Sequence, residues 1–155
     1  MGKREIIIQN PKLNTNPYRR FSYSENHKNF VAWKLQEAGI HADTHTHGLD
    51  LCAGDGPGAW IMTELGMQKD HILCVDKEAP NPPIVKGIPW LHVDVNEFSR
   101  ELSKESDQRI PLELQPLKHR FNIIISAYPQ ATESAVERVV NFFLQPGGNI
   151  LSFSF

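Results

Sequence analysis

The stretch that most constrains the fold is residues 48–60, GLDLCAGDGPGAW. A short apolar segment leads into a turn with three glycines, and apolar residues at helical spacing follow it. Glycines let the backbone turn sharply and approach a ligand closely, and the first turn of a helix offers unpaired N–H groups. A strand, a glycine-rich turn and a helix in this order are typical of α/β sheets that bind a nucleotide-like cofactor at the carboxyl ends of their strands.

Strand and helix patterns alternate along the rest of the chain. Apolar runs predict strands at 49–53, 72–76, 90–95, 121–126 and 149–155, with a shorter candidate at 6–8. Helices are predicted at 25–38, 59–65, 97–106 and 132–144. Continuous apolar strands are covered on both faces, and regular alternation with helices favours parallel pairing. The sequence therefore predicts an α/β fold with a Rossmann-like, doubly wound, mostly parallel sheet of about five strands.

Length and composition narrow the class of protein. A chain of 155 residues supports one hydrophobic core, so 1–155 is predicted to be one domain, with 1–23 as an N-terminal extension. Two cysteines make no disulfide framework, and no apolar run reaches membrane-spanning length, which favours a soluble cytoplasmic protein without membrane contact. A net charge of −2 gives no overall attraction for nucleic acid, so RNA binding would need a local basic patch.

The glycine turn fits two cofactor motifs. Residues 54–59 match the G-x-G-x-x-A fingerprint of dinucleotide-binding domains, with Asp76 about 20 residues further on, at the next strand end. Counted from Asp50, the turn matches the D-x-G-x-G-x-G motif of methyltransferases that use S-adenosyl-L-methionine (SAM), with Cys52 replacing the first glycine. Asp76 suits either cofactor, because a carboxylate accepts hydrogen bonds from two adjacent ribose hydroxyls.

Three further features favour SAM. Asp94 follows the third of the five predicted strands, where an acid suits the exocyclic amine of adenine, and Asp50 suits the ammonium of the methionine part. Pro-Gly-Gly at 146–148, before the last strand, is a third methyltransferase-like feature. Acidic residues at strand ends around such a turn usually face a ligand. The simpler alternative is that Asp50 and Asp94 only cap strand ends and that the glycines only form a tight turn.

Several segments extend the likeness beyond the glycine turn. They are AWKLQE at 32–37, ILCVD at 72–76 with the prolines after it, Asp94, and LQPGG at 144–148. With these segments, residues 30–155 resemble the FtsJ (RrmJ)-like ribose 2′-O-methyltransferases. The resemblance implies a class I methyltransferase fold, SAM as the cofactor and RNA as the methyl acceptor. It also implies a catalytic role for Lys34 and cofactor contacts from Gly54, Gly56, Gly58, Asp76 and Asp94, with Asp50 supporting them.

The chain departs from the family at its catalytic residues. Active members use a Lys-Asp-Lys-Glu tetrad, of which only the first lysine has a counterpart, Lys34. The aspartate would fall near Ala127, the second lysine near Phe153, and the glutamate beyond residue 155. A lysine acts as a base only when burial and a neighbouring positive charge lower its pKa. The alternative is therefore a catalytically inactive, methyltransferase-like domain that binds SAM or a protein partner. Tyr128 is predicted to pack over the methionine part of the cofactor.

Two other regions carry expectations. The segment HADTHTH at 41–47 has metal-ligating residue types, but nothing outside it supplies an orienting partner, so a solvated loop is favoured over a metal site. The family adds an antiparallel strand pair after its fifth strand, for which this sequence has no counterpart. Residues 149–155 are therefore expected to form an open sheet edge. Either a second copy or another polypeptide pairs with this edge, or the 155 residues are part of a longer polypeptide.

Overall fold

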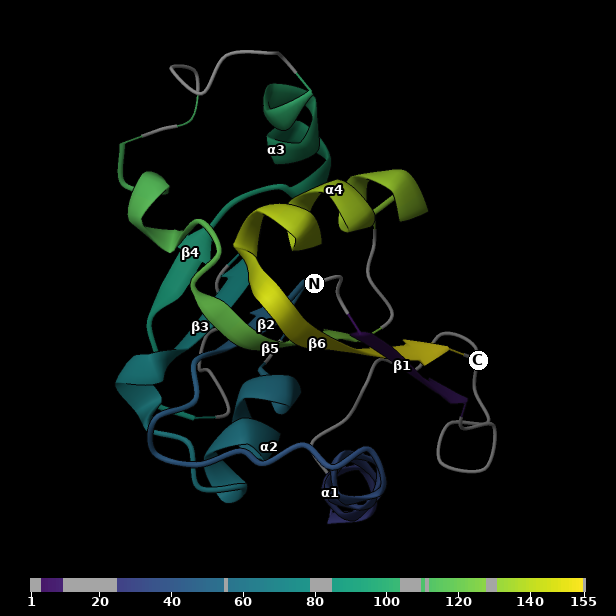
Figure 1. Cartoon of the computed structure of the whole chain (residues 1–155). Coiled ribbons are helices and arrows are strands. Elements are labelled where there is room, and N and C mark those ends of the chain that lie inside the picture. The colour runs from purple at the N-terminus through teal and green to yellow at the C-terminus, as the bar shows by residue number, and fades with distance from the viewer. Residues whose placement is uncertain are drawn as a thin grey trace.

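The computed structural model describes residues 4–9, 25–54, 56–78, 85–103, 110, 112–127 and 131–154. Six strands lie within them: β1 (Arg4–Gln9), β2 (Gly48–Leu51), β3 (Ile72–Asp76), β4 (Trp90–His92), β5 (Phe121–Ala127) and β6 (Leu144–Ser154). All six form one parallel sheet in the order β1-β6-β5-β2-β3-β4 (Figure 1). The predicted α/β fold with a Rossmann-like parallel sheet is confirmed.

Helices cover both faces of this sheet (Figure 1). α1 (Glu25–Glu37) and α2 (Pro57–Glu64) lie on one face, and α3 (Val95–Leu102) and α4 (Glu133–Phe143) lie on the other. The 3-10 turns η1 (Lys69–His71) and η3 (Gln115–Leu117) precede β3 and β5. Helices on both faces of a parallel sheet make the fold doubly wound. In the part of the chain that the structure describes, no helix has the length and apolar character needed to cross a membrane.

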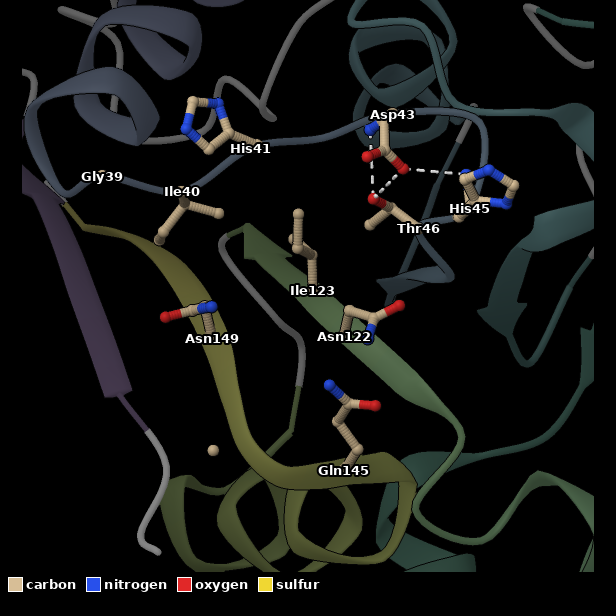
Figure 2. A pocket seen from close by; sticks show the side chains of 11 residues that line it. Gly39, Ile40, His41, Asp43, His45, Thr46, Asn122, Ile123, Gln145 and Asn149 are labelled. Atoms are coloured by element: carbon tan, nitrogen blue, oxygen red, sulfur yellow. Dashed lines mark hydrogen bonds between the residues drawn. The ribbon is translucent and has the colours of Figure 1, made fainter.

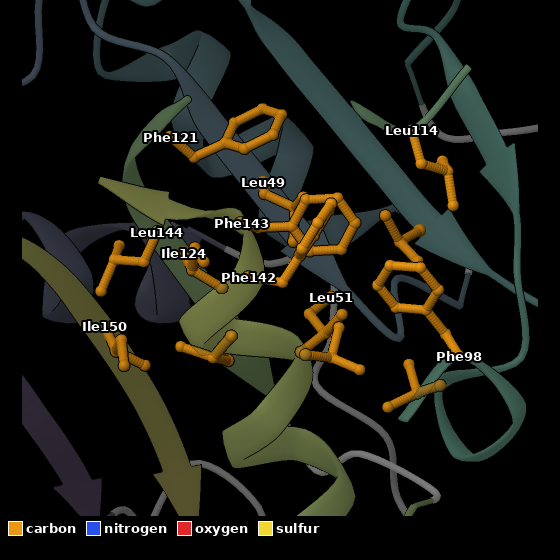
Figure 3. Close-up of a cluster of buried hydrophobic side chains, with 14 of the residues drawn as sticks. Leu49, Leu51, Phe98, Leu114, Phe121, Ile124, Phe142, Phe143, Leu144 and Ile150 are labelled. Atoms are coloured by element: carbon orange, nitrogen blue, oxygen red, sulfur yellow. The ribbon is translucent and has the colours of Figure 1, made fainter. Parts of the chain in front are cut away.

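Side-chain alternation along β2 decides which face each of its residues meets. Leu49 and Leu51 are fully buried on the α3 and α4 face, in a cluster that includes Phe98 and Phe143 (Figure 3). Successive side chains of a strand point to opposite faces, so Asp50 points to the face that α2 covers. The register that buries two leucines therefore places a carboxyl group beneath the first turn of a helix.

The N-terminal strand β1 corrects one expectation. It pairs in parallel with β6, with Arg4 opposite Asn149 and Gln9 opposite Ser154. Residues 149–153 are therefore paired on both sides, and the expectation that the last strand forms an open edge is wrong. The sequence pattern missed this pairing because β1 is short and its partner lies at the other end of the chain. Association through this side of the sheet stays a prediction, with β1 as the strand that another chain would meet.

Capping residues set several element boundaries. Gly39, with φ +72°, follows the end of α1 in the left-handed conformation that glycine favours. Thr132 Oγ1 accepts a hydrogen bond from the Ala135 N–H at 3.2 Å and starts α4. Asp94 caps α3, so this helix begins two residues earlier than predicted and the strand expected at 90–95 is shortened to β4.

Candidate functional site

The sheet brings three aspartates to one edge, at the carboxyl ends of neighbouring strands. Asp50 lies in β2, Asp76 is the last residue of β3, and Asp94 follows the end of β4. These three strands are adjacent and parallel, so their carboxyl ends share an edge of the sheet. The glycine turn between β2 and α2 lies at the same edge. The topology therefore places the predicted cofactor residues of the turn and of the three strand ends together.

The glycine turn has an unusual backbone. Cys52, Gly54 and Gly56 have φ values of +55°, +59° and +91°, all in the left-handed region that favours glycine. Cys52 thus takes the conformation expected of the motif glycine that it replaces. The Gly54 N–H donates a hydrogen bond of 2.8 Å to Asp76 Oδ2, which ties the turn to β3.

Gly58 allows the first turn of α2 to rest directly on Asp50. A Cβ atom at Gly58 would lie 2.7 Å from Asp50 Cγ, closer than real Cβ contacts come. The Ala59 N–H donates a hydrogen bond of 2.8 Å to Asp50 Oδ2. The Asp50 side chain is almost completely buried, with 2% exposure. Gly58 was predicted to let the backbone approach a ligand closely. In the structure, the backbone at Gly58 closely approaches the Asp50 side chain.

Burial controls the protonation of Asp50. The pKa of this carboxyl is raised to about 8. Loss of solvation is the main cause and the charge of Asp76 adds to it, while hydrogen bonds from Ala59 and Gly58 oppose the rise. The Cys74 thiol lies on the neighbouring strand, and burial, followed by the charges of Asp50 and Asp76, raises its pKa as well. Cys74 is therefore a buried neutral thiol and not a nucleophile.

The other two aspartates bind backbone N–H groups. Asp76 Oδ1 accepts a hydrogen bond of 3.2 Å from the Glu78 N–H. Asp94 Oδ1 accepts hydrogen bonds from the N–H groups of Asn96 at 2.8 Å and Glu97 at 3.2 Å. The structure thus gives Asp94 the capping role that was the simpler alternative to ligand binding. Both of these bonds use Oδ1, and among the described residues Asp94 Oδ2 makes no hydrogen bond.

Two residues at this edge were not singled out in the sequence. The Trp90 ring lies against the turn, since a Cβ atom at Gly56 would be 3.4 Å from its Cζ2 atom. His92 is exposed at the end of β4 and stands opposite Asp76 in the strand register. The only signal for His92 was its place two residues before Asp94, and a short strand such as β4 gives no alternation from which to infer where its side chains point.

Lys34 lies in the last turn of α1 and interacts with neighbours on its own helix. Its Nζ atom is 3.6 Å from Glu37 Oε2 and 4.7 Å from the centroid of the Trp33 ring. In the described residues, no hydrogen bond or ion pair joins Lys34 to the strand-end aspartates. Its catalytic role stays a prediction. Tyr128, predicted to pack over the cofactor, lies outside the described residues.

In the histidine-rich loop before β2, the one carboxylate, Asp43, is hydrogen-bonded within the loop itself. Asp43 Oδ1 accepts hydrogen bonds from the His45 N–H at 2.8 Å and the Thr46 hydroxyl at 3.1 Å. These bonds hold the pKa of Asp43 below its usual value, the His45 N–H having the largest effect. Across the described ranges, no three histidine, cysteine or acidic residues are grouped to hold a metal ion.

Comparison with known proteins gives no relative. No protein-family model, no curated protein and no solved structure matches this chain. Its function is therefore inferred from its sequence motifs and from the geometry of the carboxyl edge of the sheet.

Proposed function

We propose that this chain is a SAM-binding domain of the methyltransferase type, with RNA as the class of methyl acceptor. One observation carries the proposal. The buried carboxyl of Asp50 occupies the amino end of α2, directly beneath the glycine turn. RNA as the acceptor, and ribose 2′-O as the position, rest on the FtsJ-like resemblance of residues 30–155 alone.

Asp50 argues against the dinucleotide alternative. A dinucleotide places its pyrophosphate on free N–H groups at the amino end of a helix, where the helix dipole favours negative charge. In this chain the Ala59 N–H already donates to Asp50, and Gly58 donates to the same carboxyl. These two donors are therefore not free to bind a pyrophosphate. A cation there would instead favour the ionised form of Asp50, and the methionine part of SAM carries an ammonium.

The remaining residues of the edge suit an adenosine group. Gly54 and Gly56 carry no side chains, so a ligand can approach the backbone closely at these two positions. Asp76 ends β3 beside this turn, where its carboxylate can accept hydrogen bonds from ribose hydroxyls. Asp94 can cap α3 through Oδ1 and still offer Oδ2 to an adenine amine. Capping and ligand binding are thus compatible for Asp94.

The main task of the protein in methyl transfer would be to align the acceptor with the methyl group of the cofactor. When bound, SAM supplies a methyl group that its sulfonium sulfur already activates. The chain must hold the two parts of the cofactor in fixed positions and admit the acceptor in line with the methyl group. A general base adds only about 10²–10⁴-fold, and the family resemblance assigns that role to Lys34.

One observation favours the catalytically inactive alternative. Lys34 is placed against Glu37 and Trp33 of its own helix, and the acid and second lysine of the tetrad have no counterparts. A methyl-transfer assay with labelled SAM and cellular RNA separates the two versions. A Lys34→Ala variant that transfers methyl groups at the wild-type rate would exclude this lysine as the base. A wild-type protein that binds SAM but transfers nothing to any RNA would support the inactive version.

Calorimetric titration with SAM, S-adenosylhomocysteine and NAD tests the binding proposal itself. We expect saturable binding of both adenosyl-sulfur ligands and none of NAD. Asp76→Asn keeps the shape of the side chain but removes its charge, and it should weaken SAM binding about 10–100-fold, the usual value of a hydrogen bond to a charged group. Asp70→Asn is the matched control, because Asp70 is exposed in η1 before the amino end of β3. Binding of NAD alone, or of no ligand, would contradict the proposal.

A further inference from the structure

A groove of about 530 Å³ lies at the amino ends of β5 and β6 (Figure 2). The glycine turn lies at the opposite edge of the sheet. The loop that follows α1 forms one wall, and the first residues of the two strands form the other. The groove is shallow and open to solvent. Gly39 and Gly147 contribute only backbone to it. Its volume lies in the range of small-molecule sites, which is about 300–1,000 Å³.

Three carboxamides line the strand side of the groove. They are Asn122 of β5 and Gln145 and Asn149 of β6, and all three are half-buried (Figure 2). Asn122 Oδ1 accepts a hydrogen bond of 2.7 Å from the His47 N–H, which fixes the amide and leaves Nδ2 as a donor. Gln145 and Asn149 can each offer donors and an acceptor, and Asn122 adds the Nδ2 donor, so the three together present a mixed hydrogen-bonding edge.

Most of the other side chains that line the groove are apolar or carry an imidazole ring. Ile40 and Ile123 give the groove an apolar surface between the loop and the strands (Figure 2). His41 and His45 are exposed, with flat imidazole rings at the rim. The carboxylate of Asp43 is occupied by hydrogen bonds within its own loop. No lysine or arginine is among the described residues that line the groove, so a phosphate would find no strong counter-charge there.

From this combination we infer that the groove binds a single unstacked nucleobase, from a free nucleoside or from single-stranded RNA. Asparagine and glutamine side chains pair with base edges through a donor and an acceptor together. Proteins that bind single-stranded RNA stack splayed bases on flat side chains, histidine included, and read their edges by hydrogen bonds. The rim histidines supply the flat surfaces, Ile40 supplies an apolar surface, and the three carboxamides supply the edge.

The inference is independent of the proposed cofactor site, because the groove and the glycine turn lie at opposite edges of the sheet. An adenosine site at the glycine turn could nevertheless mimic nucleoside binding. The titration is therefore made with saturating S-adenosylhomocysteine present. Asp76→Asn changes the turn and leaves the groove intact, so the two sites can be tested separately.

The experiment is an NMR titration of the ¹⁵N-labelled protein with each of the four ribonucleosides and with a single-stranded oligoribonucleotide. We expect saturable shifts of the backbone amides around the groove. Asn149→Leu and Gln145→Leu should each weaken this binding about 10-fold, the value of one good amide–base pair. The control is Asn141→Leu, which removes an exposed carboxamide from α4 and should bind like the wild type.

The outcomes are distinct. Shifts with nucleosides assign the groove to a free base, and shifts with the oligonucleotide alone assign it to RNA; either supports the inference if the variants weaken binding. If Asn149→Leu does not fold, Gln145→Leu alone decides. No shift at the groove with any probe would overturn the inference. Shifts at the groove that neither leucine variant reduces would also overturn it.

Discussion

The two edges of the sheet differ in chemistry. At the carboxyl edge, three aspartates meet a glycine turn, and all three accept hydrogen bonds from backbone N–H groups. At the amino edge, histidines and carboxamides gather. Five of the seven histidines lie in the segments that lead into β2, β3 and β5: His41, His45, His47, His71 and His119. A parallel sheet sends every strand end of one kind to one edge, so residues that flank strands in sequence become neighbours in space.

This difference gives the two edges opposite responses to pH. Asp50 has a raised pKa, so it binds its proton more tightly in the folded than in the unfolded protein. His47 has a lowered pKa, mainly because it is desolvated and secondly because His71 lies beside it, so it binds its proton less tightly when folded. The Asp50 contribution therefore lowers stability as the pH rises, and the His47 contribution lowers it as the pH falls.

The largest expected effect is the pH dependence that Asp50 causes. Between its unfolded pKa of 3.8 and its folded pKa of about 8, the unfolded state binds fewer protons, so the free energy of unfolding falls as the pH rises. The slope is at most about 1.4 kcal/mol per pH unit. Asp50→Asn should flatten the curve measured by urea unfolding between pH 5 and 8. The exposed Glu113→Gln variant should follow the wild type, and an Asp50→Asn curve as steep as the wild-type curve would contradict the assignment.

The second effect tests the contact between Gly58 and Asp50. Gly58→Ala places a Cβ atom 2.7 Å from Asp50 Cγ in a buried site, and overpacking of this kind costs about 1–3 kcal/mol. The same substitution in an Asp50→Ala background should cost much less, because the crowded carboxyl is gone. Urea unfolding of the four proteins measures the coupling. Equal costs in both backgrounds would show that Gly58 is required for another reason.

At the amino edge the expected effect is smaller, because the histidine pair is only half-buried. The rings of His47 and His71 stack with centroids 4.2 Å apart, and the buried Nδ1 atom of His71 has no hydrogen-bond partner in the described structure. Arg120 also lowers the pKa of His47, while Asp70 raises it. As the pH falls through the unfolded histidine pKa of about 6.5, the protein should lose stability.

His71→Phe tests this pair, since phenylalanine keeps the stacked ring but removes the second charge. The variant should lose less stability than the wild type between pH 7 and 5 in thermal unfolding. His119→Phe is not a suitable control, because His119 Nδ1 is hydrogen-bonded to the Leu144 carbonyl. The exposed His92 at the other edge is a suitable control. His92→Phe should lose as much stability as the wild type between pH 7 and 5. If His71→Phe and the wild type lose the same stability between pH 7 and 5, the histidine pair is not the cause of that loss.

The sequence predicted the carboxyl edge better than the amino edge. The turn after β2 and the acids that end β3 and follow β4 were foreseeable, because each stands directly after an apolar run and parallel strands share their ends. The carboxamides of the groove were not, because Asn122, Gln145 and Asn149 have no common spacing and meet only through strand pairing. The pairing of β1 with β6 was missed for the same reason, since register between distant segments leaves no local pattern.

Lys34 gives the smallest expected effect and the sharpest contrast with Asp50. Both were assigned to one site, but Asp50 is buried under the glycine turn, whereas Lys34 is partly exposed and paired within α1. An exposed i,i+3 ion pair contributes little, so Lys34→Met, which keeps the apolar stem, should change stability by less than about 0.5 kcal/mol. Its affinity for SAM should equal that of the wild type in calorimetry, while Asp76→Asn weakens binding. A large loss of SAM affinity in Lys34→Met would instead place this lysine at the cofactor. That result would favour the position that the family resemblance implies for Lys34.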